Sequence, residues 1–152
     1  MGFSTLDITL RPMAEADLDQ VMAIESASFS CPWNRQHFLA ELAAPHAFPL
    51  VACSGSGEVA GYLCPSLVAD EGEILDVAVA PAWRGQGIGR LLLAEAMADC
   101  RSRGAIAVHL EVRPSSTAAV ALYEAFGFVR TGLRKRYYQD GEDAILMQYT
   151  FT

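Results

Sequence analysis

The sequence predicts an α/β (α+β) fold in which a mixed sheet of about seven strands carries helices on both faces. Its 152 residues, of which 52% are hydrophobic, are enough for one domain with one core, which we expect to span residues 1–152. Apolar runs of strand length and segments of helical spacing follow one another in the order β-α-α-β-β-β-α-β-α-β-β. Glycine and proline breaks separate these segments, and no linker or repeat interrupts them.

The N-terminal elements are an edge strand, two helices and a hairpin. Their predicted ranges are Leu6–Arg11, Ala14–Phe29, Arg35–Leu42, Leu50–Cys53 and Glu58–Leu67. In the first helix, Leu18, Val21, Met22 and Glu25 recur at helical spacing. Asn34 is suited to cap the second helix because its side chain can accept a hydrogen bond from an amide of the first turn. The turn Ser54-Gly55-Ser56-Gly57 closes the hairpin.

The C-terminal elements begin with a short apolar strand, Ile74–Ala80, which we expect to be buried on both faces. Pro81 ends it because proline cannot continue a central strand. A helix then runs from Ile88 to about Arg103, and Gly104 closes it. The remaining elements are the strand Ala105–Val112, the helix Thr117–Phe126 closed by Gly127, the strand Phe128–Tyr138, the turn Asp140-Gly141 and the strand Asp143–Phe151.

Composition narrows the classes of function. The apolar runs are too short to cross a bilayer, and no secretory signal begins the chain, so we expect a cytoplasmic protein without membrane contact. The net charge of −7 argues against direct binding to nucleic acid; it fits a basic partner, or simply solubility. The cysteines form no C-x-x-C pair, which predicts reduced, mostly buried thiols and no metal site. They are Cys31, Cys53, Cys64 and Cys100.

A glycine-rich loop, Arg84-Gly85-Gln86-Gly87-Ile88-Gly89, joins the apolar strand to the long helix. The first turn of a helix has amides without partners and a positive dipole, and glycines allow an anion to approach them closely. Arg84 adds a positive charge, so we expect a phosphate or pyrophosphate on Gln86 to Arg90. The loop lacks the Gly-Lys-Ser/Thr of a P-loop, and Arg90 stands where a dinucleotide fingerprint needs glycine. The remaining alternative is a tight turn before a surface helix.

The loop resembles the R/Q-x-x-G-x-G/A pyrophosphate loop of the GNAT acetyltransferase superfamily, and the order of elements is similar over nearly the whole chain. Within that superfamily the sequence resembles the RimI group, which acetylates the N-terminal alanine of ribosomal protein S18. The matching segments are Cys31-Pro32-Trp33, Ile74–Pro81, Arg84–Gly89, Leu110-Glu111-Val112-Arg113-Pro114, Ala121-Leu122-Tyr123-Glu124, Gly127-Phe128, Tyr137-Tyr138 and Asp140-Gly141-Glu142-Asp143-Ala144.

The resemblance implies a GNAT fold with a splay between the two central parallel strands and acetyl-CoA as cofactor. It also implies that the substrate is a protein N-terminus, whose amine attacks the acetyl group directly in a ternary complex. The implied cofactor-binding residues are Val77, Ala78, Val79, Arg84, Gly85, Gln86, Gly87, Ile88, Gly89, Arg90, Ser116 and Tyr123. Ser116 stands where the group has Asn, so it keeps a hydroxyl and a capping role but reaches less far. The implied walls of the peptide cleft are Phe29, Pro32, Trp33, Tyr137 and Tyr138.

Two residues are candidates for acid–base chemistry. Strand alternation places His109, Glu111 and Arg113 on one face, and the resemblance makes Glu111 the general base. The alternative is a carboxylate that is merely paired with Arg113 or His109. Tyr123 is the implied acid for the leaving thiolate, with an aromatic packed in the core as the alternative.

Other groups are weaker candidates. His109, Glu73 and Asp76 are alternative proton acceptors, and Cys31 has no neighbour that would activate it as a nucleophile. The run Arg134-Lys135-Arg136 fits a solvated edge strand better than a phosphate contact. Two other functions stay open: acetylation of a lysine or small-molecule amine, and acyl-CoA binding without catalysis. The presence of both Glu111 and Tyr123 counts against the second.

Overall fold

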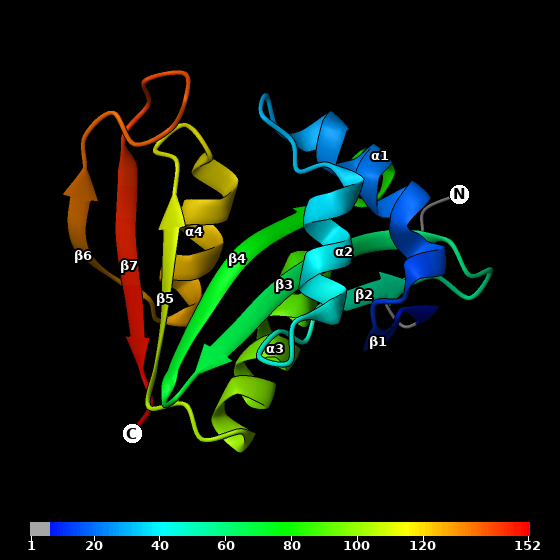
Figure 1. Ribbon diagram of the computed structural model, residues 1–152. Coiled ribbons are helices and arrows are strands. Elements are labelled where there is room, and N and C mark those ends of the chain that lie inside the picture. The colour runs from blue at the N-terminus through cyan, green and yellow to red at the C-terminus, as the bar shows by residue number, and fades with distance from the viewer. Residues whose placement is uncertain (1–6) are drawn as a thin grey trace.

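The computed structural model describes residues 7–152 and contains a seven-stranded mixed sheet with helices on both faces (Figure 1). The strands run in the order β1-β2-β3-β4-β5-β7-β6, which confirms the predicted fold class. Their bounds are β1 Thr9–Pro12, β2 Leu50–Cys53, β3 Val59–Val68, β4 Glu71–Val79, β5 Ala107–Val112, β6 Val129–Arg134 and β7 Ala144–Thr150. The helices are α1 Leu18–Ser28, α2 Arg35–Ala43, α3 Ile88–Ser102 and α4 Thr117–Phe126, with short 3-10 helices η2 Glu15–Asp17 and η3 Pro81–Trp83.

The helices divide the core into two layers. Helices α1 and α2 pack on one face of the sheet through Leu18, Val21, Phe38 and their neighbours. On the other face, α3 buries Ile88, Leu92, Leu93, Ala96, Met97 and Cys100, which recur at spacings of three and four, and α4 lies on the same side. Asn34 caps α2 as predicted, with its side chain accepting a hydrogen bond from the His37 amide. In the part of the chain that the structure describes, no helix has both the length and the apolarity needed to span a membrane.

The central strands β4 and β5 separate part-way along their length. They pair in parallel from Glu71 opposite Ala107 only as far as Ile74 opposite Leu110. On its other side β4 stays paired with β3 up to Val79, but the register shifts where Cys64 faces Asp76 and Pro65 faces Ile74, so that Leu75 is an extra residue. Such a bulge bends its strand, and Figure 1 shows β4 diverging from β5 toward one end. The splay implied by the resemblance is therefore present.

Several elements differ from the sequence prediction. The strand β4 begins at Glu71, and it is not buried on both faces: residues 75–77 are half-buried because they face the space where β5 has diverged. The first predicted helix splits into η2 and α1. The strand β6 is shorter than predicted and fully exposed, and Arg136, with φ of +51°, cannot continue it. Leu6 lies outside the described residues.

Asp17 joins the first strand to the first helix. It is buried, and its two carboxylate oxygens accept hydrogen bonds from the Arg11 guanidinium at 2.8 and 2.7 Å. The Ala14 amide donates a third bond at 2.8 Å. These bonds, above all those from Arg11, lower the pKa of Asp17 below its usual range.

We predict that Asp17→Ala lowers the free energy of unfolding by roughly 1–3 kcal/mol, because three partly buried hydrogen bonds to a buried, charged acceptor are lost. The measurement is urea unfolding at neutral pH, with Glu15→Ala, at an exposed neighbouring position, as the control. Because the folded pKa of Asp17 is lowered, the loss should be fully present above the unfolded pKa of about 3.9 and should shrink as pH falls through the folded value. Equal unfolding midpoints for both variants would contradict this role.

Candidate functional site

The glycine-rich loop has the backbone geometry of an anion-binding turn. Gly85 and Gly87 have φ of +76° and +86°, values that residues with a Cβ adopt only with strain. Gly87 is the N-cap of α3, and the first bond within the helix runs from the Leu91 amide to the Gly87 carbonyl. The amides of residues 88–90 therefore have no acceptor within the helix, and the helix dipole adds positive potential there.

This loop forms one side of a cleft of about 810 Å³, the first cleft. The opposite side is the start of α4, so two helix N-termini border it. Residues 77–79 of β4 form the inner wall. A Cβ on Gly89 would lie 3.4 Å from the Leu122 side chain, which shows how closely α3 and α4 approach each other here. The size and the unpaired amides fit a large anionic ligand such as a nucleotide-bearing coenzyme.

Ten of the twelve predicted cofactor-binding residues line the first cleft, and Gln86 and Tyr123 do not. The Gln86 side chain does not line it and instead donates to the Ala82 carbonyl at 3.4 Å. The Arg84 guanidinium donates to the Val79 carbonyl at 2.9 Å and to the Ser28 hydroxyl at 3.0 Å, so it joins α1 to β4 besides adding charge. Tyr123 lines a neighbouring cleft. The ten predicted residues that line the first cleft are Val77, Ala78, Val79, Arg84, Gly85, Gly87, Ile88, Gly89, Arg90 and Ser116.

Ser116 does not cap α4 with its side chain, so that part of the prediction is wrong. It occupies the N-cap position, but its φ of −82° and ψ of 64° are not the extended conformation in which a cap hydroxyl reaches the first-turn amides. Its neighbour Ser115 makes the polar contacts instead, to Glu142.

A second cleft, of about 520 Å³, opens where β4 and β5 diverge. It shares Val77 and Ser116 with the first cleft, so the two meet at the splay. Of the predicted acid–base and peptide-contacting residues it collects Glu111, Tyr123, Phe29, Trp33, Tyr137 and Tyr138. Pro32 is exposed and does not line it, because the loop after α1 turns the Phe29 and Trp33 side chains, rather than Pro32, toward the cleft.

Glu111 is not engaged by the basic neighbours on its own strand. His109 pairs with Glu71, and Arg113 pairs with Asp140 and Glu142, so the alternative that either residue neutralises Glu111 is excluded. The Glu111 side chain is 26% exposed, and Arg134 Nε lies 3.9 Å from Oε1. Interaction with Glu111 raises the pKa of the neighbouring Tyr137 hydroxyl. The carboxylate is thus accessible from the second cleft.

Tyr123 is 4% exposed and packs edge-on against Phe128 at 5.7 Å between ring centroids. Burial raises the pKa of the Tyr123 hydroxyl above its usual range, so it remains a proton donor at neutral pH. Burial also raises the pKa of Tyr138, with a contribution from the Glu111 charge, to about 12. The cleft therefore combines one accessible carboxylate with protonated phenols.

The alternative proton acceptors are placed differently from one another. Glu73 lies outside both clefts, although partial desolvation and the Glu111 charge raise its pKa. Asp76 lines the second cleft beside Glu25, a buried residue of α1 that the sequence analysis did not select. The sequence did contain a signal for Glu25. It lies four residues after Val21 on the apolar side of the predicted helix, so its carboxylate faces the core.

Comparison with known proteins shows the family to which the chain belongs. The sequence model of the acetyltransferase (GNAT) family matches residues 18–128, which include both central strands, the glycine loop and α4. The chain belongs to the GNAT acetyltransferase family.

Several relatives are similar to this chain over almost their full length. A Bacillus subtilis protein provisionally named as a ribosomal protein bS18-alanine N-acetyltransferase is 40% identical, covering 93% of this chain and 94% of that protein. The N-alpha-acetyltransferase RimI of Mycobacterium tuberculosis is 39% identical over 97% of this chain and 96% of its own. The crystal structure of the ribosomal-protein-S18-alanine N-acetyltransferase from Escherichia coli superposes with a TM-score of 0.87 at 32% identity, covering 95% and 94% of the two chains.

GNAT acetyltransferases use acetyl-CoA. In residues 7–152, no three His, Cys, Asp or Glu side chains are grouped so that they could hold a metal ion. The cysteines are unpaired, and all but Cys31 are buried, as predicted.

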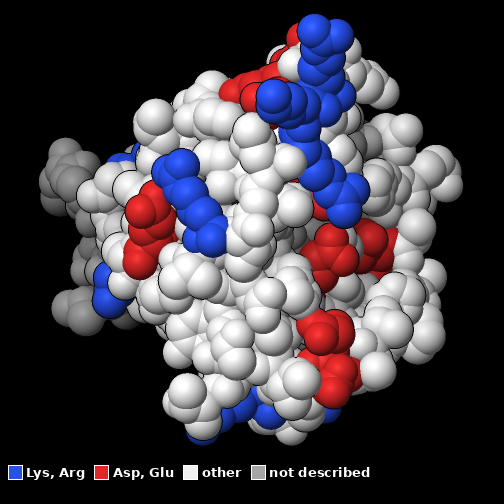
Figure 2. Space-filling model, turned by 90° about the vertical axis from the view of Figure 1, so that its left-hand side faces the viewer, with Lys and Arg blue, Asp and Glu red and all other residues white. Residues whose placement is uncertain are grey.

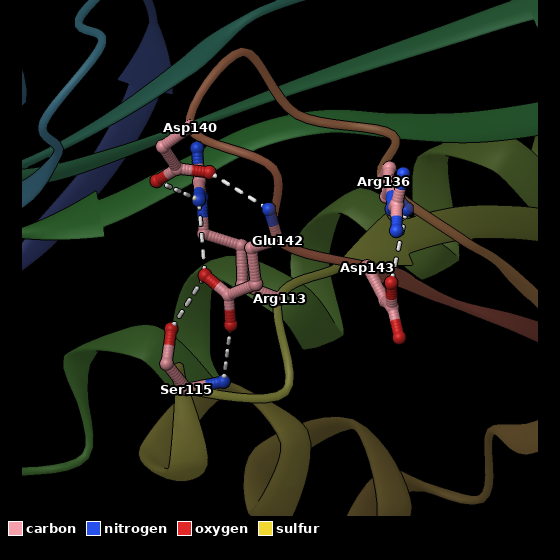
Figure 3. Close-up of polar contacts among 6 residues, drawn as sticks. All are labelled: Arg113, Ser115, Arg136, Asp140, Glu142 and Asp143. Carbon is pink, nitrogen blue, oxygen red and sulfur yellow. Dashed lines mark hydrogen bonds and ion pairs between the residues drawn. The ribbon is translucent and has the colours of Figure 1, made fainter.

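The loop after β6 is attached to the junction of β5 and α4 (Figure 3). Glu142 accepts hydrogen bonds from the Ser115 amide and hydroxyl, both at 2.9 Å, and from Arg113 at 3.0 Å. Arg113 also donates to Asp140 at 2.7 Å and stacks over the Tyr138 ring at 3.9 Å. These bonds, first those from Ser115, lower the pKa of Glu142. They hold Tyr137 and Tyr138 beside the second cleft.

Charge is unevenly distributed around this loop. Figure 2 shows a ridge of basic side chains at the top of this face and acidic side chains grouped below it. Arg134 belongs to β6 and lies beside Glu111 and the Tyr137 ring, outside the first cleft. The predicted edge strand therefore includes only Arg134, because Lys135 and Arg136 lie in the turn that follows β6, and all three residues are exposed.

We predict that Glu142→Gln loosens residues 137–143, because the loop loses the charge that Arg113 and Ser115 bind. Hydrogen exchange of these amides should accelerate, whereas Glu124→Gln, which removes an exposed pair with Arg130 at 3.2 Å, should leave them unchanged. Since the pKa of Glu142 is lowered, the wild-type loop should stay attached above the ordinary carboxyl pKa and loosen as pH falls through the lowered value. Unchanged exchange in Glu142→Gln would show that the loop is held by other contacts.

Proposed function

We propose that the protein transfers the acetyl group of acetyl-CoA to the N-terminal α-amine of a protein, and that its substrate is the N-terminal alanine of ribosomal protein S18. The observation that carries this proposal is the meeting of two clefts at the splay. One has the unpaired amides that suit a pyrophosphate, and the other holds Glu111 and Tyr123. The substrate follows the names of the relatives. A ribosomal substrate implies that the enzyme acts in the cytoplasm.

The first cleft would hold the coenzyme. Amides of residues 88–90 and the charges of Arg84 and Arg90 suit its diphosphate, and the wall formed by residues 77–79 suits the pantetheine arm. Acetyl-CoA supplies a thioester, whose carbonyl carbon an amine can attack. Beyond Ile74, the β5-facing backbone of β4 has no strand partner, so its amides are available to stabilise negative charge on the thioester oxygen.

Glu111 would act as general base. A protein α-amine has a pKa of about 7.7–8.0, against about 10.4 for lysine, so only a modest proton affinity is required of the acceptor. Glu111 lies at the end of β5 and faces the second cleft, where the N-terminus of a peptide would enter between Trp33 and the tyrosine pair. Arg134 at 3.9 Å is not a direct hydrogen-bond partner, so it leaves the carboxylate able to accept a proton.

Tyr123 would act as general acid toward the departing thiolate. Its hydroxyl keeps its proton at neutral pH because it is buried, and its ring is fixed by Phe128. Cys31 also lines the second cleft, but among the described residues no base hydrogen bonds to it. The arrangement therefore favours direct attack by the amine over an acyl-enzyme on cysteine.

We predict that Glu111→Gln and Tyr123→Phe each lower kcat by roughly 10²-fold or more, because each removes one proton-transfer group and preserves shape. Steady-state CoA release at saturating substrates measures this. Glu58→Gln, in the distant β2–β3 hairpin, and Tyr149→Phe, which packs against Phe126 and Phe128, serve as matched controls. Full activity in both site variants would remove this mechanism.

The substrate is tested with peptides. We expect CoA release with a peptide carrying the N-terminal sequence of ribosomal protein S18, and none with the same peptide blocked at its α-amine. Two further sets of peptides complete the test. One varies the first residue, and the other has a lysine side chain as its only free amine. Release with lysine or a small amine alone would indicate a different acetyltransferase. Binding of acetyl-CoA without release with any amine would indicate a binding module.

A further inference from the structure

Two carboxyl groups contact each other in the wall of the second cleft without a cation beside them. Glu25 comes from α1 and is 2% exposed, and Asp76 comes from β4 with its Oδ2 atom buried. The two carboxyl groups lie within hydrogen-bonding reach of each other, and Asp76 Oδ2 accepts no hydrogen bond from any other described residue. Among residues 7–152, no lysine, arginine or histidine hydrogen bonds or ion pairs with either of them.

One of these two carboxyl groups must therefore be protonated. Two carboxylates in contact and away from water cannot both be charged, because desolvation and mutual repulsion disfavour the second charge. Burial, followed by the hydrogen bond and charge of Glu25, raises the pKa of Asp76 well above its usual range. Both oxygens of Glu25 already accept hydrogen bonds, from the Trp33 amide and the Tyr62 hydroxyl, which favours the charged form of Glu25. We therefore assign the shared proton to Asp76, which can donate it toward Glu25.

Glu25 gathers donors from three separate parts of the chain. Its Oε1 accepts the hydroxyl of Tyr62 in β3, whose pKa is raised by burial, and its Oε2 accepts the amide of Trp33 at 2.9 Å. Asp76 in β4 is the third partner. The Trp33 ring stacks on His37, with centroids 3.7 Å apart, so the backbone and the ring of this residue are both held. Phe29, Cys31 and Trp33 of this loop line the second cleft.

We propose that Asp76 is a positioning residue for the peptide: as a hydrogen-bond donor it fixes Glu25, and Glu25 holds the Trp33 backbone at the wall of the second cleft. This role rests on the proposed function for its effect on peptide binding. It differs from the role of proton acceptor considered for Asp76 from the sequence, because the donor form cannot take a proton from the amine. Glu111 then has no competing base on β4 within this cleft.

The test compares Asp76→Asn with Asp76→Leu. Asparagine is neutral and keeps an N–H donor toward Glu25, so peptide KM should stay near the wild-type value. Leucine has similar bulk but no donor, so peptide KM should rise roughly ten- to hundredfold, the scale of one hydrogen bond to a charged group. The KM for acetyl-CoA should be unchanged in both, because Asp76 does not line the first cleft.

Amide exchange of Trp33 gives a direct readout that needs no substrate. It should accelerate in Asp76→Leu and stay protected in Asp76→Asn, while the His37 amide, which is bound by Asn34, should be unchanged in both. If Asp76→Leu does not fold, Asp76→Asn alone still decides, because the proposal requires it to behave like the wild type.

Two results would overturn the proposal. One is a peptide KM in Asp76→Asn raised as much as in Asp76→Leu, which would mean that an ionised Asp76 is needed, for example to bind the substrate ammonium. The other is wild-type peptide KM and wild-type Trp33 protection in Asp76→Leu. A wild-type protein without activity on any peptide would refute the proposed function, and the Trp33 exchange would still test the positioning role.

Discussion

The divergence of β4 from β5 is the constraint on which the site depends. A sheet that stayed paired past Ile74 and Leu110 would consume the backbone groups of β4 and close the space in which Glu111 and Tyr123 lie. The divergence follows from the bulge at Leu75 opposite Cys64 and Pro65, since a residue added to one strand bends that strand. Pro65 has no amide to offer the ladder, which suits it to this irregular position.

Local sequence signals predicted the elements, but long-range pairing decided the site. Helical spacing identified α3, Asn34 marked the start of α2, and alternation placed Glu111 on the polar face of β5. The orientation of Arg84 could not be read locally, because its partners, Val79 and Ser28, come from two other elements. The length of β6 was overestimated because its apolar and charged residues continue past the point where Arg136 turns the backbone.

The same distinction explains what was missed at Glu25. Its position on the apolar stripe of the first helix was visible in the sequence, yet its meaning required Asp76 and Tyr62, which only the folded sheet brings to it. The prediction that Ser116 caps α4 was wrong for a related reason. Ser115, and not Ser116, makes the polar contacts there, and its partner Glu142 comes from a distant loop.

Carboxylates acting as acceptors recur at the joints of this acidic protein. Asp17 joins β1 to η2, Glu25 joins α1 to two strands and the next loop, and Glu142 joins the loop after β6 to α4. In each case donors come from the backbone or from side chains of other elements. Part of the negative charge therefore fixes loops, and the isoelectric point of about 4.8 is not only a matter of solubility.

The outer strand β6 leaves its own row of backbone groups without a neighbour in the sheet. It carries Arg130 and Arg134 on an exposed surface, and its register with β7 shifts between Arg130 and Gly132. Like charges and a broken register both hinder a second chain from extending the sheet. The open edge next to the site therefore carries two features that disfavour intermolecular strand pairing.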